Sequence, residues 1–218
     1  MIEEFTQYFF SRISSTPKAQ LAAATAPVAE KESETEAETE IASDIPLVNA
    51  ARMGDRAAFD QLYFRYSRMV HGILLARAPR TEVDDLVQDV FLFAWRKMDT
   101  LREAGAFGGW LAMIARNRAF DFHRRKNETD ELTDSVAENA MTAPQARTEA
   151  IAALNAIRSL PEAYRETLIL RLVEGMTGPE IAARTGLTAA SVRVNLHRGM
   201  KLLREKLDGK TTSGSIDD

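Results

Sequence analysis

The chain of 218 residues contains no cysteine and only three histidines. Without cysteine there is no disulfide framework, no thiolate nucleophile and no cysteine-ligated metal, and the composition suits the reducing cytoplasm. The histidines His71, His123 and His197 are far apart in the sequence and form no HxxxH-type pair. We therefore expect no metal site and no cofactor.

Long apolar runs and enzyme motifs are also missing. No stretch approaches the roughly 18 apolar residues of a membrane span, and the N-terminal MIEEFTQYFFSRI is acidic at its start, without a basic leader. The sequence has no glycine-rich phosphate-binding motif and no nucleophile beside a placed base. We expect a cytoplasmic protein that neither enters a membrane nor catalyses a reaction. The only feature that supports the alternative of a DNA-cleaving enzyme is the adjacent pair Asp84 and Asp85.

The net charge is slightly negative, but positive charge is concentrated in two places. The formal net charge is -4 and the isoelectric point is about 5.6, which taken alone argues against nucleic acid. Glutamate occupies every even position of residues 30–40 (EKESETEAETE), whereas residues 115–126 (ARNRAFDFHRRK) and 192–206 (VRVNLHRGMKLLREK) are strongly basic. These two basic segments are the candidate nucleic-acid contacts.

Polar stretches divide the chain into five parts. The first part is rich in Ala, Ser, Thr, Pro and Glu over most of its length and buries too little to offset chain entropy. Two later parts carry apolar residues at helical spacing. The fold class predicted is all-α, with two small helical domains joined by a flexible linker. The parts are a disordered acidic extension (1–43), a helical domain (44–126), an acidic linker (127–149), a second helical domain (150–208) and a disordered tail (209–218).

The second domain has the pattern of a helix-turn-helix. Thr177 and Glu180 are spaced as a capping box, Gly186 marks a turn, and Thr188 precedes a longer basic helix. Ser159 begins a further predicted capping box. We expect the outer face of the basic helix to contact duplex DNA, although a solvated charged face is the alternative. The candidates for base edges are Ser191, Arg193, Val194 and His197, with Arg198, Lys201 and Arg204 nearer phosphates.

A helix predicted from about Trp110 to Lys126 interleaves aromatic, amide and cationic groups on one side. Such a surface suits single-stranded nucleic acid, because bases stack on rings while phosphates meet arginines. The alternative is structural: Trp110 would cover a small core, and Asn117 would satisfy a local backbone group. The residues alone leave both alternatives open.

Residues 84–95 (DDLVQDVFLFAW) carry more apolar surface than one small domain needs. On a helix the apolar arc covers roughly 200°, against a stripe of little over about 100° for a helix at the edge of a core. Either neighbouring helices cover both apolar faces, or the surplus docks a partner helix, with Trp95 as a hot spot. The candidate docking residues are Asp85, Leu86, Gln88, Asp89, Phe91 and Trp95.

Five segments of the chain occur in a distinctive order. They are GDRAAFDQLYFRY, DDLVQDVFLFAW, FGGWLAMIARNRAFDFHRRK, SLPEAYRETLILRLVEGMTGPEIA and SVRVNLHRGMKLLRE. Together they resemble the extracytoplasmic function (ECF) sigma factors of bacteria, a subfamily of the sigma-70 family. The resemblance covers about residues 45–126 and 150–207, and it implies sigma region two in the first domain and region four in the second. It implies an alternative sigma factor for promoter-specific initiation, in a stress response and under an anti-sigma factor.

The same resemblance implies partners and roles. The 84–95 helix would grip the clamp helices of the largest subunit of core RNA polymerase, and the flap of the second-largest subunit would be a further partner. Region four would read the minus-thirty-five element of double-stranded promoter DNA, and the linker would thread toward the polymerase active centre. The competing prediction is a helix-turn-helix regulator that binds duplex DNA without docking on polymerase. The residues implied for the melted, single-stranded minus-ten element are Leu101, Phe107, Trp110, Asn117, Asp121, Arg124 and Arg125.

Three positions depart from the family pattern. Leu101 stands where an aromatic residue is common, Asn195 where arginine is common, and Gly199 where alanine is common. Glycine inside a helix costs around 0.5 to 1 kcal/mol relative to alanine. We therefore expect Gly199 to weaken the basic helix.

Overall fold

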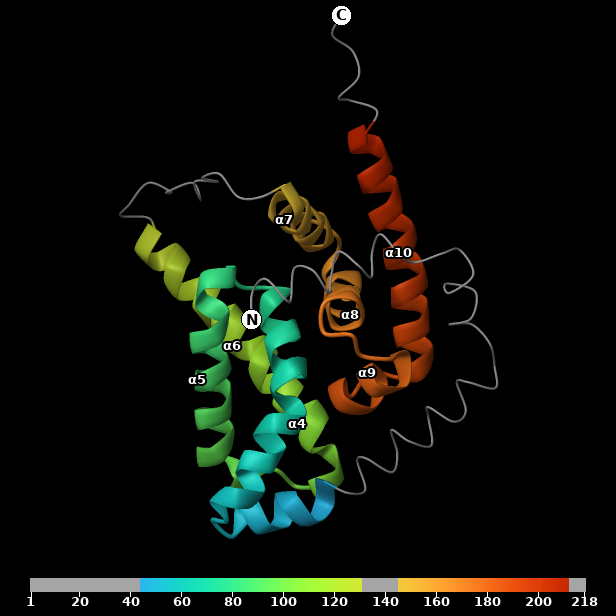
Figure 1. The fold of residues 1–218 in the computed structure, drawn as a ribbon. Coiled ribbons are helices and arrows are strands. Elements are labelled where there is room, and N and C mark those ends of the chain that lie inside the picture. The colour runs from blue at the N-terminus through green and yellow to red at the C-terminus, as the bar shows by residue number, and fades with distance from the viewer. Residues whose placement is uncertain (1–43, 131–144, 212–218) are drawn as a thin grey trace, which may run out of the picture.

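The computed structural model describes residues 44–130 and 145–211, and every regular element in these two ranges is helical. The predicted all-α fold class is therefore confirmed. The predicted extension lies outside the described residues. Two helical units follow each other along the chain (Figure 1). The first contains α4 (Arg56–Leu75), α5 (Val83–Arg96) and α6 (Phe107–Asp130); the second contains α7 (Gln145–Arg158), α8 (Glu162–Leu172), α9 (Gly178–Thr185) and α10 (Ala189–Thr211).

The first unit begins with a helix over residues 44–52, after which Gly54 turns the chain with a φ of 92°, a conformation that favours glycine. Asp55 then caps α4. Its carboxylate accepts hydrogen bonds from the backbone N–H groups of Ala57 at 2.9 Å and of Ala58 at 3.2 Å. The predicted break and N-cap are confirmed. Short 3₁₀ turns connect the helices that follow: η1 (Arg80–Glu82), η2 (Met98–Thr100) and η3 (Ala104–Ala106).

The helix-turn-helix of the second unit is built as the sequence predicts. Thr177 and Glu180 form a capping box, in which each side chain accepts a hydrogen bond from the other residue's backbone N–H. Gly186 ends α9 with a φ of 75°. The Thr188 hydroxyl then caps α10 by accepting from the backbone N–H of Ser191 at 3.1 Å.

The capping box predicted at Ser159 is wrong. The Ser159 hydroxyl donates to the carbonyl of Ala156 at 2.7 Å, at the end of α7. Pro161 occupies the N-cap of α8 and makes no side-chain cap. The Ser159 side chain therefore closes one helix instead of opening the next.

The linker is shorter than predicted. Helix α6 continues through Asp130 and α7 begins at Gln145, so helices enter the predicted linker (127–149) from both sides. The rest of it, residues 131–144, lies outside the described residues. Helix α10 likewise continues to Thr211, into the predicted tail.

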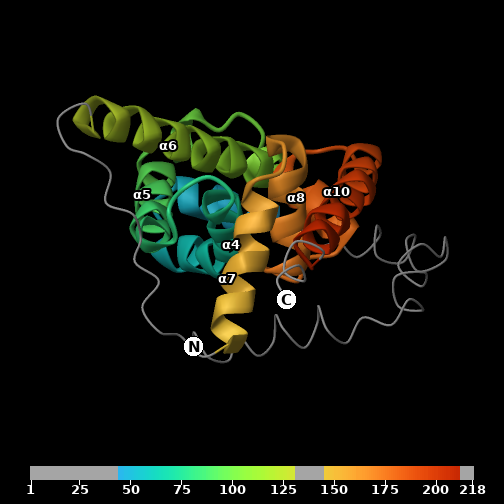
Figure 2. The same ribbon diagram turned by 90° about the horizontal axis from the view of Figure 1, so that it is seen from above.

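The two units pack against each other: α8 lies against α4 (Figure 2), and α9, labelled in Figure 1, contacts α6 and α4. Glycine permits the closest approach. A Cβ atom at Gly108 would lie 2.6 Å from the carbonyl oxygen of Arg184, and a Cβ atom at Gly186 would lie 3.3 Å from Cα of Gly109. The start of α6 is therefore pressed against the turn of the helix-turn-helix.

Candidate nucleic-acid interface

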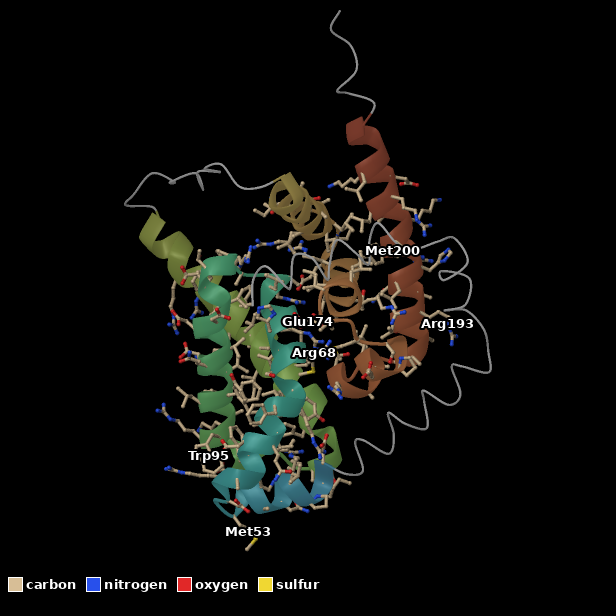
Figure 3. The ribbon with its side chains drawn as sticks, in the orientation of Figure 1. Met53, Arg68, Trp95, Glu174, Arg193 and Met200 are labelled. Atoms are coloured by element: carbon tan, nitrogen blue, oxygen red, sulfur yellow. The ribbon has the colours of Figure 1, made fainter. Side chains whose placement is uncertain are left out.

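The outer face of α10 is exposed. All six residues predicted for it (Ser191, Arg193, Val194, His197, Arg198 and Lys201) are exposed, and Arg204 extends the face. Val192 and Leu203 are buried on the opposite side, against the rest of the second unit. Figure 3 shows Arg193 pointing away from α8. Because the apolar side fixes the rotation of the helix, its basic side is presented to solvent.

Gly199 has a packing role in this helix. It is buried where α10 crosses α8, and a Cβ atom there would lie 3.0 Å from Cδ1 of Leu168 and 3.1 Å from Cβ of Tyr164. These separations are tight for carbon atoms. Glycine at position 199, where the family commonly has alanine, therefore allows α10 to pack close to α8. An argument from helix propensity alone does not predict this packing role.

The outer face of α6 carries several residues predicted for the minus-ten element. Asn117, Arg124 and Arg125 are exposed. Asp121 is half-buried, and its carboxylate lies 3.6 Å from the Arg124 guanidinium. Trp110 is also half-buried, at the start of the helix.

Two exposed apolar residues lie on this face of α6: Phe120, which the sequence places at its flank, and Met113, which the sequence reasoning missed. Phe120 is 70% exposed and Met113 is 51% exposed. Together with Asn117 and Arg124 they fall at helical spacings of three and four residues, and so share one face. The sequence carries a signal for this face: the small residues of the helix, such as the buried Ala115, fall on its opposite side and mark the side that packs inward.

Leu101 and Phe107 are not surface residues, which corrects the expectation that their side chains face DNA; a contact of this turn with the melted strand stays a prediction. Both are buried in the core of the first unit. The Phe107 ring lies edge-on to Tyr66, with centroids 5.1 Å apart, and the backbone carbonyl of Leu101 accepts a hydrogen bond from Arg52. These residues hold the turn before α6 in place.

The docking face predicted on α5 also needs correction. Leu86 is 8% and Phe91 4% exposed, because α4 and α6 pack against α5. The Phe91 ring lies 4.6 Å from Tyr63, centroid to centroid. Trp95 is half-buried, 4.9 Å from the ring of Phe59. Neighbouring helices therefore cover one part of the apolar arc and leave another part, with Leu92, exposed, and docking of a partner on α5 stays a prediction.

What α5 does present is a mostly polar surface. Asp85, Gln88 and Asp89 are exposed as predicted, and Leu92, which the sequence reasoning missed, is 54% exposed among them. Beside it, the guanidinium of Arg118 lies 4.4 Å from the centre of the Phe93 ring. A pocket is lined by Asp89, Leu92, Phe93, Arg96 and Arg118.

Buried charges join the two units. The Glu166 carboxylate of α8 accepts hydrogen bonds from Arg116 of α6 at 2.7 and 3.1 Å, and lies 2.7 Å from the guanidinium of Arg77. Burial alone would raise the pKa of Glu166, but the hydrogen bonds and charges of the two arginines outweigh it and lower that pKa below its usual value. Arg116 is thereby engaged by the second unit.

A histidine makes a second link. His71 Nδ1 lies 2.7 Å from the carboxylate of Glu174, which lies between α4 and α8 in Figure 3. Burial alone would lower the pKa of His71, but the hydrogen bond and charge of Glu174 outweigh it and raise that pKa above 6.5. Among the described residues, no cluster of three or more His, Asp or Glu side chains could hold a metal, and no helix is long and apolar enough to cross a membrane.

Known proteins share this pair of units. The family profile named Sigma-70 region 2 matches residues 62–129, and that named Sigma-70, region 4 matches residues 150–203. The RNA polymerase sigma factor CnrH of Cupriavidus metallidurans is 32% identical over 186 residues, which cover 76% of this chain and 95% of the relative. The chain belongs to the ECF sigma factors of the sigma-70 family.

Two further matches agree with that family. The ECF RNA polymerase sigma-E factor of Escherichia coli K12 is 30% identical to this sigma factor over 186 residues, covering 77% of this chain and 94% of the relative. The solved structure of CnrH in complex with the cytosolic domain of CnrY is similar with a TM-score of 0.55 and 29% identity, covering 76% of this chain and 97% of that one. The predicted family and two-domain fold are confirmed.

Proposed function

We propose that this sigma factor binds core RNA polymerase and directs promoter-specific transcription initiation. The observation that carries the proposal is the outer face of α10, where all six residues predicted to contact DNA are exposed on a capped helix of a helix-turn-helix. Such a helix enters the major groove with its N-terminal residues at the base edges. In a sigma-70 region four, that groove would belong to the minus-thirty-five element.

The base edges would be read by the first turns of α10. Ser191, Arg193, Val194 and His197 lie in these turns, and Arg198 and Lys201 lie further along the helix. Arginine is the commonest bidentate partner of guanine in the major groove, whereas the side chains further along would meet phosphates.

The exposed face of α6 would hold the unpaired minus-ten strand. Met113 and Phe120 offer apolar surface beside Asn117 on which bases can stack, and Arg124 and Arg125 supply positive charge for phosphates. Trp110 and Asp121 would border the same strand, and the buried pair Leu101 and Phe107 would act by positioning the turn before the helix.

The exposed residues of α5 would dock on the clamp helices of the largest polymerase subunit. Leu92 supplies an apolar centre, and Asp85, Gln88 and Asp89 supply a polar rim. Trp95 contributes only the part of its ring that α4 leaves uncovered. The second helical unit would bind the flap of the second-largest polymerase subunit.

The proposal involves no catalysis by this chain. Opening of the duplex would draw on binding energy for unstacked bases, and the chain would act in the cytoplasm beside polymerase. Control by an anti-sigma factor in a stress response is proposed as well. It is supported by the relative CnrH, whose solved structure contains the cytosolic domain of CnrY.

The experiment is co-purification with bacterial core RNA polymerase, followed by run-off transcription on a promoter library. Stable association with promoter-specific initiation is expected, and the enriched promoters give the recognition sequence. Failure to bind core polymerase, with retained binding of duplex DNA, would contradict the proposal and favour a helix-turn-helix regulator.

A further inference from the structure

The outer face of α10 is a continuous basic surface. We call Arg193, His197, Arg198, Lys201 and Arg204 the α10 basic face; all five are exposed. Residues 189–204 contain no acidic residue. Glu205, which follows directly, is the first acidic residue of the helix. The face upstream of it has a net positive charge, which attracts an anion of matching shape.

The same chain supplies such an anion. Residues 30–40 contain six glutamates against one lysine, with glutamate at every second position. In an extended chain every second side chain points to one side, so these carboxylates would recur about every 6.6 Å along one edge. Arg193, His197 and Lys201 recur every four residues and so lie about 6 Å apart along the helix axis. The two spacings match.

The attachment point of this segment lies beside the helix-turn-helix. Asp44, the first described residue, forms an ion pair with Arg65, and its carboxylate accepts a hydrogen bond from the Tyr66 hydroxyl at 2.6 Å. Arg184 of α9, in the second unit, contacts the same two residues, Arg65 and Tyr66. Its guanidinium donates to the backbone carbonyl of Arg65 at 2.9 Å and lies 5.8 Å from the centre of the Tyr66 ring.

Few residues separate the acidic segment from the helix-turn-helix. Only the turn over residues 186–188 separates α9 from α10. Four to fourteen residues join the glutamates to Asp44, and an extended chain spans at most about 3.5 Å per residue, so they can extend from about 14 to 49 Å. Joining two groups through so few residues gives an effective concentration on the order of millimolar.

We propose that the acidic segment 30–40 binds the α10 basic face within the same chain. Its carboxylates occupy the positions that phosphates of duplex DNA would take. The contact is electrostatic, so it weakens as salt rises. Its regulatory consequence, competition with promoter DNA, rests on the proposed function; the contact itself does not.

The first experiment maps the contact directly in the full-length chain. Because the chain has no cysteine, the variant Ala37→Cys takes a single nitroxide label in the acidic segment, and Ser135→Cys is the control label in the linker. We expect the label at residue 37 to broaden the amide signals of residues 193–204 selectively. Broadening should disappear at about 1 M salt, where the Debye length is about 3 Å.

Each other outcome of that experiment overturns the proposal. Uniform or absent broadening from residue 37 means that no specific contact exists. Broadening of residues 116–125 instead places the segment on α6. Broadening in a mixture of labelled chain and separate isotope-enriched chain shows that the occupant comes from a second copy.

The second experiment measures competition with DNA. The full-length variant with Glu32, Glu34, Glu36 and Glu38 changed to Gln should bind a duplex probe about fivefold to tenfold more tightly at low salt, because the self-bound state no longer competes. The matched control neutralises the acids between α6 and α7 instead, Glu131, Asp134 and Glu138, and should change affinity less than about twofold.

The readouts separate the two proposals. An unchanged DNA affinity in the Glu-to-Gln variant, or an equal gain in the linker control, contradicts the self-contact. Failure of the sigma function alone would appear as loss of core polymerase binding, while the broadening of α10 from residue 37 persisted.

Discussion

Glu166 and Arg116 are fifty residues apart in the sequence, yet their side chains form a bidentate ion pair across the two units, at 2.7 and 3.1 Å. Glu166 is 4% exposed. Arg77 meets the same carboxylate at 2.7 Å. One buried anion therefore ties two cations of the first unit to α8, and this arrangement has measurable consequences.

Replacing Glu166 by Gln should lower the free energy of unfolding by about 2 to 4 kcal/mol, because two arginines lose their buried counter-charge. Urea unfolding followed by circular dichroism measures the loss. The control is Glu162→Gln: Glu162 also pairs with Arg77, but its side chain is 68% exposed. The control should stay within about 1 kcal/mol of wild type, and equal losses would contradict the role given to burial.

The link between His71 and Glu174 should make stability depend on pH. The pKa of His71 is raised above 6.5 in the folded chain, so its contribution is fully present below pH 6.5 and is lost as pH rises through the folded pKa. Urea midpoints measured from pH 6 to 9 should fall more for wild type than for His71→Gln. Parallel curves for the two proteins would show that the link contributes nothing.

Glu166 predicts the opposite dependence at acid pH. Its pKa is lowered from 4.5 in the folded chain, so its contribution is fully present above pH 4.5 and is lost as pH falls through the folded pKa. Acid unfolding of wild type should therefore be steeper than that of Glu166→Gln. The same slope in both would contradict the assignment.

The close crossing at Gly199 predicts intolerance of a larger side chain. Gly199→Leu should cost about 1 to 3 kcal/mol, because the new atoms would overlap Leu168 and Tyr164. Ala190→Leu, on the exposed side of α10, is the matched control and should stay within about 0.5 kcal/mol of wild type. Thermal unfolding of both variants measures the difference.

Leu92 is the residue to change in the proposed polymerase dock. Phe91 is unsuitable, since truncating a buried phenylalanine destabilises the core by about 3 to 5 kcal/mol. Leu92→Asp should keep wild-type stability while weakening binding to core polymerase by about tenfold or more. The control is Met53→Asp, at an apolar residue that is 90% exposed in the turn before α4 and outside the α5 face, and it should bind as wild type does. Unchanged binding by Leu92→Asp would remove the dock from this face.

Arg193 and Arg204 should differ in their effect on DNA specificity. Arg193→Ala should cost about 1 to 3 kcal/mol at the cognate site and relax specificity at one or two positions, as expected for a base contact. Arg204→Ala should weaken binding to all sequences alike, as expected for a phosphate contact. Affinities on a randomised duplex library measure both. A uniform loss for Arg193→Ala would make it a phosphate contact.

The sequence by itself determined the local elements. Asp55, Thr177 and Thr188 cap helices because a short oxygen-bearing side chain satisfies backbone donors within its own turn, and Gly186 ends a helix through its own positive φ. The exposed side of α10 followed from helical periodicity. These features depend on residues within a few positions of each other, so they can be predicted from the sequence alone.

Only the tertiary structure decided which apolar faces are covered and which charges meet. Leu86 and Phe91 looked like surplus surface until α4 and α6 proved to cover them, while Met113 and Phe120 stayed exposed because no described helix packs there. The pairing of Arg116 with Glu166 joins segments fifty residues apart. Periodicity gives the direction of a side chain on its own helix, but its neighbour is set by how distant helices pack, and no local pattern encodes that.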